Sequence, residues 1–133
     1  MGIHTFGAIY IGSNEVSLKI FEISAKRGIR TIDYVRTRIE LARDTYSIGS
    51  IGYELVETLC DTLAEFHKIM DGYRVDDYEA YAAAAIRDAE NELFVLDQIR
   101  IRTGISVTVL SNSEHRFISY KSVAMRENFE KMI

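Results

Sequence analysis

The sequence contains no proline and no tryptophan, and it has a single cysteine, Cys60. A lone cysteine cannot form an internal disulfide, which indicates a reducing, cytoplasmic location. The three histidines, His4, His67 and His115, are scattered, so the pattern predicts no metal site of the cysteine–histidine type. The chain also lacks a proline-rich linker, a low-complexity segment and an internal repeat. We therefore expect one continuous domain over residues 1–133.

The sequence has no excess of positive charge and no long hydrophobic run. Its 16 Lys and Arg residues are outnumbered by 20 Asp and Glu residues, which makes the formal net charge −4. Nucleic-acid-binding domains and polybasic membrane anchors both need clustered basic residues, so we expect neither partner. The apolar runs are too short to cross a bilayer, and Met1–Phe6 has no signal-peptide pattern. With 47% hydrophobic and 27% charged residues, the chain has the composition of a globular domain.

The first forty residues have the pattern of β-strands. Apolar and β-branched residues predict three strands, at Phe6–Ile11, Val16–Ile23 and Ile29–Leu41. The segment Gly12–Asn14 separates the first two strands. A turn that ends at Gly28, a residue suited to positive φ, separates the second from the third. Connections this short predict antiparallel pairing, because a parallel pair needs a long crossover.

From residue 50 onward the apolar spacing alternates between that of helices and that of strands. Ser50 is the candidate N-cap of the first helix, and Gly104 closes the second. The residues of these helices that we expect to face the core are Ile51, Leu55, Leu59, Leu63, Phe66, Met70, Leu93, Leu96 and Ile99. The elements expected in this part of the chain are a helix that ends at Asp71–Gly72, a strand at Tyr78–Ala85, a helix at Asp88–Thr103, a strand at Ile105–Leu110 and a helix from Glu114 to about Lys131.

The expected order of elements is therefore βββαβαβα. Three antiparallel strands followed by helical crossovers to parallel strands describe an α/β fold with the mixed sheet of the ribonuclease-H-like class. A sheet of this kind binds ligands at the carboxyl ends of its strands. The three segments that follow strands are therefore the candidate site.

Two of these segments carry groups suited to phosphate. Gly12–Asn14 could form a phosphate loop, in which backbone N–H groups and the Ser13 hydroxyl donate to oxygens, or it could be a plain hairpin turn. Arg87 could hold a phosphate bidentately, or it could be a surface arginine beside Asp88 at a helix start. Asp88 and Asn91 could equally be helix caps.

The third segment contains Glu114 and His115. Either side chain could act as a general base that orients water. The alternative is the capped first turn of a helix, where an acidic residue is favourable, beside a solvated histidine. Cys60 follows Leu59 on a helix, and we expect it to be a packing residue rather than a nucleophile.

Three segments of the chain resemble, in order, the motifs of one family. Ala8–Asn14 resembles the opening A-I-D-I-G-S-N, and Ala82–Asn91 resembles A-T-S-A-(hydrophobic)-R-(acidic)-A-x-N. Val109–Tyr120 resembles V-I-S-G-x-E-E-A-R-L-I-Y, and Thr103–Ile105 matches the T-G-I before it. The resemblance runs from about Phe6 to Val123, and its motifs are those of the exopolyphosphatase and guanosine pentaphosphate phosphohydrolase family. It implies the fold of the actin-like ATPase superfamily, in agreement with the order of elements above.

The resemblance implies hydrolysis of a phosphoanhydride bond with Mg²⁺. The substrate would be polyphosphate, which loses its terminal phosphate, or guanosine pentaphosphate, which loses its 5′ phosphate. By the same resemblance, Gly12, Ser13 and Asn14 would be the first phosphate loop. Arg87 would be the arginine that clamps the phosphate.

The chain departs from the family's motifs at four positions. The acidic residue of the first strand falls on Tyr10, which offers no carboxylate to Mg²⁺, and the threonine of the second motif falls on Ala83. The glycine of the third motif falls on Asn112. The two adjacent glutamates fall on Glu114 and His115, and the second of them is the expected catalytic base. These replacements predict a site in which hydrolysis is absent or impaired.

The family also has a second half with a D-I-G-G-G-S phosphate loop, and nothing after Val123 resembles it. We expect the chain to be a fragment or a natural half of the two-domain core, with an apolar flank that docks the second domain or promotes self-association. The first hypothesis is the N-terminal domain of an exopolyphosphatase-like hydrolase. The second is a non-catalytic module that binds a phosphorylated ligand or serves assembly. An active enzyme with a rearranged Glu114–His115 site ranks third.

Overall fold

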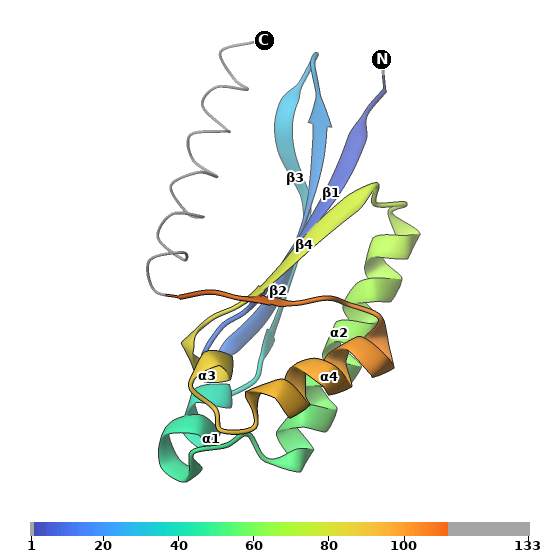
Figure 1. Ribbon diagram of the computed structural model, residues 1–133. Coiled ribbons are helices and arrows are strands. Elements are labelled where there is room, and N and C mark those ends of the chain that lie inside the picture. The colour runs from blue at the N-terminus through green and yellow to red at the C-terminus, as the bar shows by residue number, and fades with distance from the viewer. Residues whose placement is uncertain (1, 112–133) are drawn as a thin grey trace.

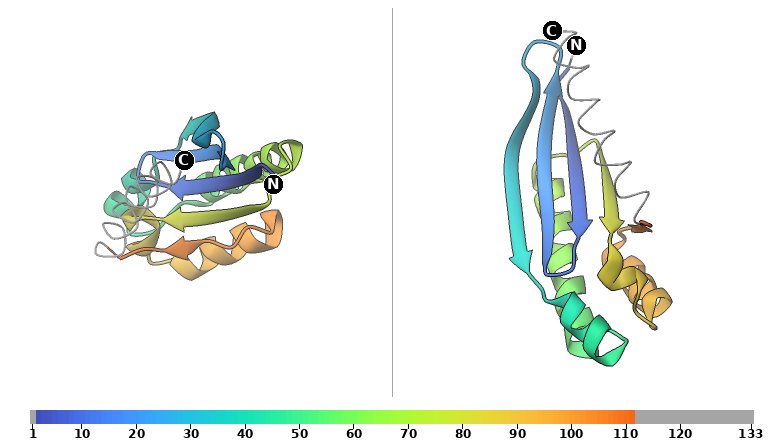
Figure 2. Two further views of the ribbon diagram at one scale, coloured as in Figure 1. Left: turned by 90° about the horizontal axis from the view of Figure 1, so that it is seen from above. Right: turned by 90° about the vertical axis from the view of Figure 1, so that its left-hand side faces the viewer.

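The computed structural model describes residues 2–111 of the chain (Figure 1). A mixed sheet of five strands forms one layer, and Figure 2 shows helix α2 behind the sheet when the sheet is viewed face on. The elements are β1 His4–Ile11, β2 Glu15–Ser24, β3 Gly28–Arg38, α1 Leu41–Ile48, α2 Tyr53–Gly72, β4 Asp77–Ala82, α3 Ala84–Arg87, α4 Glu92–Thr103 and β5 Thr108–Val109. The predicted α/β class is confirmed.

The strand order in the sheet is β3-β2-β1-β4-β5. The first three strands pair antiparallel, as their short connections predict, and a bulge interrupts the β2–β3 pairing next to Ile20. Strand β4 pairs parallel with β1, and β5 pairs parallel with β4. Helices α2 and α4 are the main parts of the two long crossovers that such parallel pairs require.

One face of the sheet forms the core with α2 and α4. The register places Ile9 between Leu18 of β2 and Ala80 of β4, and all three side chains are buried. Gly7 lies on the same face, where a Cβ atom would come within 2.8 Å of the Sδ atom of Met70. The other buried residues of this layer include Ile11, Val16, Ile20, Leu59, Cys60, Leu63, Phe66, Ala82, Val95 and Ile99.

Two glycines and the cysteine behave as predicted. Gly28 has a φ of 78° in the turn between β2 and β3, and Gly104 has a φ of 75° after α4, so both adopt the left-handed conformation that favours glycine. Cys60 is buried in α2, and this burial raises the pKa of its thiol. The cysteine is therefore a packing residue of the core, and its thiolate is disfavoured.

The third strand is shorter than predicted. It ends at Arg38, and Leu41, expected to be in the strand, is instead the first residue of α1. The chain turns at this point because Ile39 donates its N–H to the carbonyl of Asn14, 3.1 Å away, rather than to a strand neighbour. Both apolar residues remain buried, which is why their pattern resembles the end of a strand.

The predicted boundaries around β4 and both long helices also need correction. The N-cap residue of α2 is Gly52 and not Ser50, and the Asp44 side chain accepts the N–H of Gly52 at 2.8 Å. Strand β4 ends at Ala82, because the backbone turns into α3 two residues later.

Helix α4 begins at Glu92 and not at Asp88. Its Leu93 is 79% exposed, against expectation, because Val95 and Ile99 define the inward face and position 93 lies on the other side of the helix. Strand β5 covers only two residues of the predicted Ile105–Leu110.

The predicted helix from Glu114 to about Lys131 lies outside the described residues. Within residues 2–111, no helix has both the length and the apolar character needed to cross a membrane.

Candidate functional site

Three segments leave the sheet at the same edge. Strands β1, β4 and β5 are parallel, and their register aligns Ile11 with Ala82 and Ala82 with Val109. The alignment continues past the strand ends: Ala83 donates its N–H to the carbonyl of Ile11 at 3.0 Å, and Leu110 donates to Ala82 at 2.9 Å. The β1–β2 loop, helix α3 and the residues after β5 therefore meet at one carboxyl edge, where sheets of this class bind ligands.

The β1–β2 loop consists of Gly12, Ser13 and Asn14. Gly12 is buried and donates its N–H to the carbonyl of Glu15 at 2.9 Å. A Cβ atom at Gly12 would lie 3.0 Å from that carbonyl oxygen and 3.1 Å from the Tyr10 ring, so a side chain there would require its neighbours to shift slightly. The segment forms a hairpin turn between β1 and β2, and its role as a phosphate loop stays a prediction.

Residues beyond β3 hold this loop in place. Ala42, in the first turn of α1, donates its N–H to the carbonyl of Ser13 at 2.9 Å. Ile39 does the same for Asn14. The loop is therefore held by α1 and by the residue that follows β3, and α1 is absent from the predicted fold.

Tyr10 precedes the loop on the sheet face opposite the core. The register places it between Ser17 of β2 and Tyr81 of β4. Partial burial raises the pKa of its phenol, so the group is neutral at physiological pH. The position at which the resembling family has a carboxylate is thus occupied by an uncharged aromatic ring.

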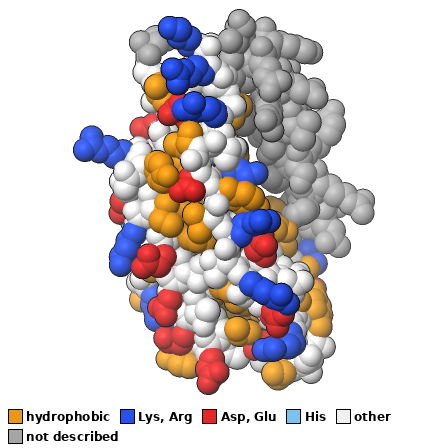
Figure 3. Space-filling model, turned by 180° about the vertical axis from the view of Figure 1, so that it is seen from behind, with side chains coloured by type: hydrophobic (Ala, Val, Ile, Leu, Met, Phe, Trp, Pro, Cys, Tyr) orange, Lys and Arg blue, Asp and Glu red, His pale blue; other side chains and the backbone are white. Residues whose placement is uncertain are grey.

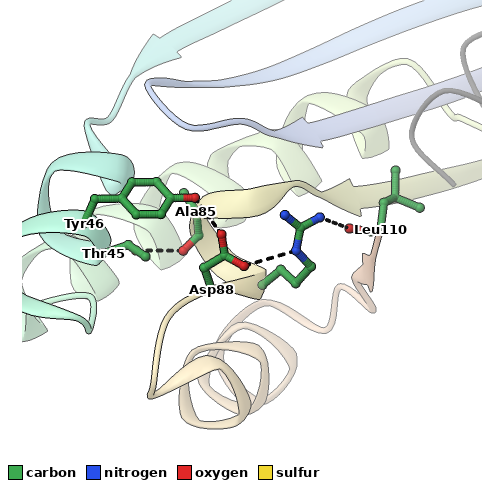
Figure 4. A network of polar contacts seen from close by, with 6 residues as sticks. Thr45, Tyr46, Ala85, Asp88 and Leu110 are labelled. Carbon is green, nitrogen blue, oxygen red and sulfur yellow. Dashed lines mark hydrogen bonds and ion pairs between the residues drawn. The ribbon is translucent and has the colours of Figure 1, made fainter. Parts of the chain in front are cut away.

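Arg87 ends helix α3 at the carboxyl edge. Its Nε atom lies 3.2 Å from Oδ1 of Asp88, and its Nη1 atom donates to the carbonyl oxygen of Leu110 at 3.0 Å (Figure 4). The Tyr46 hydroxyl donates to Oδ2 of Asp88 at 2.7 Å. The hydrogen bond from Tyr46 is the main cause that holds the pKa of Asp88 below its usual value, and the bond from Arg87 is the second. The bond between Tyr46 and Asp88 also raises the pKa of the Tyr46 phenol. The arginine is beside Asp88, as the surface alternative predicted, and it also lies at the predicted edge.

Asp88 and Asn91 are not side-chain caps. Asn91 occupies the N-cap position of α4, but its side chain makes no capping bond. Instead its amide pairs with both backbone groups of Ile51, at 3.0 Å and 2.9 Å. The Asp88 carboxylate accepts hydrogen bonds from Tyr46 and Arg87. The side chains of Asp88 and Asn91 thus connect the edge segment to Tyr46 and Ile51, which are distant in sequence.

The described donors at this edge do not fit Mg²⁺. Mg²⁺ prefers carboxylate, phosphate and water oxygens. The loop offers the neutral side chains of Ser13 and Asn14, and the end of β1 offers the neutral phenol of Tyr10. The carboxylate of Asp88 is held by Tyr46 and Arg87. Among residues 2–111, no group of three or more His, Cys, Asp or Glu side chains is placed to hold a metal ion.

Charge is mixed around the carboxyl edge. Figure 3 shows acidic and basic side chains interspersed at the lower end of the molecule, where α1 lies. Lys and Arg side chains gather instead at the upper end, where the β2–β3 turn carries the exposed residues Lys26 and Arg27. An anion at the edge would therefore be held by individual donors rather than by a broad positive field.

Glu114 and His115, the candidate bases, lie outside the described residues, as does Asn112. Helix α1, with Thr45 and Tyr46, is the part of this edge that the sequence analysis missed. The signal in the sequence that could have found it is the four-residue spacing of Leu41 and Thr45, followed by Gly49 as a helix-ending glycine, which has a φ of 93° in the structure.

A sequence model described as the Ppx/GppA phosphatase family matches residues 19–131. Two curated relatives are each named Exopolyphosphatase 1. The protein of Mycobacterium tuberculosis is 31% identical over 119 residues, and the protein of Mycobacterium leprae is 29% identical over the same length. Each match covers 88% of this chain and 34% of the relative. The chain thus spans about a third of the length of the curated relatives it matches.

Solved structures with the same arrangement of elements are also found. A Ppx/GppA family member of Aquifex aeolicus superposes with a TM-score of 0.80 at 26% identity, covering 84% of this chain and 36% of that chain. An exopolyphosphatase of Cytophaga hutchinsonii superposes with a TM-score of 0.78 at 26% identity. The superposition covers 83% of this chain and 35% of that chain. These likenesses confirm the predicted fold class.

Proposed function

The chain belongs to the Ppx/GppA phosphatase family, and we propose that it is the N-terminal domain of a phosphoanhydride hydrolase that acts on polyphosphate or guanosine pentaphosphate. The observation that carries the proposal is the meeting of the β1–β2 loop and Arg87 at one carboxyl edge of the sheet. Phosphate oxygens accept hydrogen bonds from hydroxyl and guanidinium donors of the kinds that Ser13 and Arg87 carry. The exopolyphosphatase names of the curated relatives support this substrate class.

We further propose that hydrolysis is weak in this chain. Phosphoryl transfer to water needs charge stabilisation at the phosphate and a base that orients the water. Tyr10 is neutral where a carboxylate would bind Mg²⁺, and Ala83, the N-cap residue of α3, has no side-chain oxygen. Glu114 and His115 are proposed as the pair that positions water, a role that rests on the resemblance alone.

A binding module is the second candidate function. Such a module would keep Ser13, Asn14 and Arg87 as ligands for a phosphorylated molecule and would not need the lost carboxylate. Helix α4 offers apolar surface on which a further partner could dock, because Leu93 is 79% exposed and Ile101 is 63% exposed. This partner would be a second domain or a second copy of the chain. The buried Cys60 is compatible with a cytoplasmic, reducing setting.

A titration calorimetry experiment tests the phosphate site. The 133-residue chain is titrated with tripolyphosphate, as wild type and as the Arg87→Ala variant. We expect the substitution to weaken binding by about tenfold or more, since a charge-assisted bond to phosphate is lost. Arg100→Ala is the matched control, because this arginine pairs with Asp97 on α4. Absence of binding by the wild type, or equal binding by Arg87→Ala, would contradict the proposal.

Phosphate release from polyphosphate separates the two candidate functions. The assay compares the wild type with a Tyr10→Asp, His115→Glu double variant, in the presence of Mg²⁺ and on the longest protein that the gene encodes. If the chain is a weakened hydrolase, the double variant releases phosphate faster than the wild type. If binding is unchanged and no release appears in either protein, the binding module is the better description.

A further inference from the structure

Tyr46, Asp88 and Arg87 form a chain of polar contacts that leads from α1 to the carboxyl edge (Figure 4). Tyr46 and Asp88 are 42 residues apart in sequence, and their oxygens are 2.7 Å apart. Asp88 uses one carboxylate oxygen for Tyr46 and the other for Nε of Arg87. Asp88 therefore links the Tyr46 hydroxyl to the Arg87 guanidinium.

The contacts restrict the guanidinium group on two of its edges. Asp88 faces Nε, and the carbonyl of Leu110 accepts from Nη1. A guanidinium is planar and rigid, so two bonds at different edges determine the orientation of its plane. An exposed arginine–aspartate pair by itself holds little geometry, because both side chains lose rotamer freedom to form it. The additional bond from Tyr46 orients the carboxylate and thereby the arginine.

A buried hydrogen bond between α1 and α3 keeps Tyr46 close to Asp88. The buried hydroxyl of Thr45, the residue before Tyr46, donates to the carbonyl of Ala85 in α3 at 2.7 Å. Tyr46 itself is 60% exposed, so its ring contributes little to the core. The contribution of its side chain therefore lies in the hydroxyl.

We propose that Tyr46 is a positioning residue of the phosphate site, whose hydroxyl orients Asp88 so that Arg87 meets a phosphate oxygen in one fixed orientation. The inference rests on the proposed function, because it deepens the role given there to Arg87. It assigns to α1 a second task at this edge, besides holding the β1–β2 loop.

The test uses Tyr46→Phe, which removes only the hydroxyl. The matched control is Tyr53→Phe, because Tyr53 is also exposed and hydrogen-bonds the carboxylate of Glu57, which pairs with Arg102 and not with Arg87. The first readout is the ¹H–¹⁵N signal of Arg87 Nε, assigned by its loss in Arg87→Lys. We expect it to shift and exchange faster with water in Tyr46→Phe and to stay unchanged in Tyr53→Phe.

The second readout is the Kd for tripolyphosphate. We expect Tyr46→Phe to weaken binding about threefold or more, at the lower end of the net effect of one hydrogen bond, and to lower the melting temperature no more than Tyr53→Phe does. If Arg87→Ala weakens binding while Tyr46→Phe changes neither the Nε signal nor the Kd, the positioning role is overturned and the phosphate site stands. If the wild type does not bind, or Arg87→Ala binds equally well, the phosphate site and the positioning role are overturned together.

Discussion

The Asn91 side chain pairs with the backbone of Ile51 through two hydrogen bonds. Its Oδ1 atom accepts the N–H of Ile51 at 3.0 Å, and its Nδ2 atom donates to the Ile51 carbonyl at 2.9 Å. The neighbouring residue Glu90 adds a backbone bond to the carbonyl of Gly49 at 2.8 Å. The start of α4 is thereby joined to the connection between α1 and α2, which keeps the edge segment after β4 in place.

Replacing this asparagine should destabilise the fold. Asn91→Ala leaves the N–H and carbonyl of Ile51 without their partners in a partly buried place, and we expect the free energy of unfolding to fall by about 1–3 kcal/mol. Urea denaturation measures the change. Gln98→Ala on the same helix is the control and should stay within about 0.5 kcal/mol of the wild type. Equal stability of Asn91→Ala and the control would contradict the role of the pair.

The buried hydroxyl of Thr45 should matter more than a similar hydroxyl on the surface. Thr45→Val keeps the shape of the side chain but leaves the carbonyl of Ala85 unpaired, which should lower the free energy of unfolding by about 1–3 kcal/mol. Thr58→Val is the matched control, since Thr58 is exposed and donates only to Glu54 within its own helix. Thermal unfolding of both variants decides, and a comparable loss in Thr58→Val would argue against a specific α1–α3 contact.

A side chain at residue 7 of β1 would require Met70 of α2 to move. In Gly7→Ala the new methyl group would lie 2.8 Å from the Met70 Sδ atom, and we expect a loss of about 1–3 kcal/mol from this overpacking. Adding Gly7→Ala to a Met70→Ala protein should cost much less, because the clash is then absent. Gly72→Ala is the control, since nothing lies within 4 Å of a Cβ there. Strictly additive effects of the first two substitutions would exclude this explanation.

Tyr81 should make stability depend on alkaline pH. It donates a hydrogen bond to Glu79 at 2.6 Å, which raises the pKa of its phenol to about 12. The pKa is therefore higher in the folded than in the unfolded state, where it is about 10. The protonated phenol stabilises the fold fully below that value, and this contribution is lost as the pH rises through the folded pKa.

Urea denaturation at about pH 9 and about pH 11, on either side of the unfolded pKa, measures this loss. The wild type should lose more stability between the two than Tyr81→Phe, which has no phenol to ionise at this position. In Glu79→Gln the pKa of the Tyr81 phenol, followed by the NMR signals of its ring, should move back towards the ordinary range. An identical pH dependence of wild type and Tyr81→Phe would show that the hydrogen bond does not shift the titration.

The misplaced elements share one physical cause. The apolar pattern of Ile39 and Leu41 is the same whether a strand continues or the chain turns, because both residues are buried either way. The turn is decided by the carbonyls of Ser13 and Asn14, which accept hydrogen bonds from residues after β3. Similarly, α4 has apolar residues on more than one side, and packing against the core buries Val95 and Ile99 and leaves Leu93 exposed.

Local patterns in the sequence determined the fold class, the antiparallel order of the first three strands, and the position of the Gly12–Asn14 loop directly after a strand. These features depend on residues close together in the chain, so periodicity and turn chemistry are sufficient to predict them. Tertiary structure alone decided how Arg87 is held and what fastens the edge. The bonds of Tyr46 to Asp88 and of Asn91 to Ile51 join residues 42 and 40 positions apart, and these partners meet only once the sheet and its helices have packed.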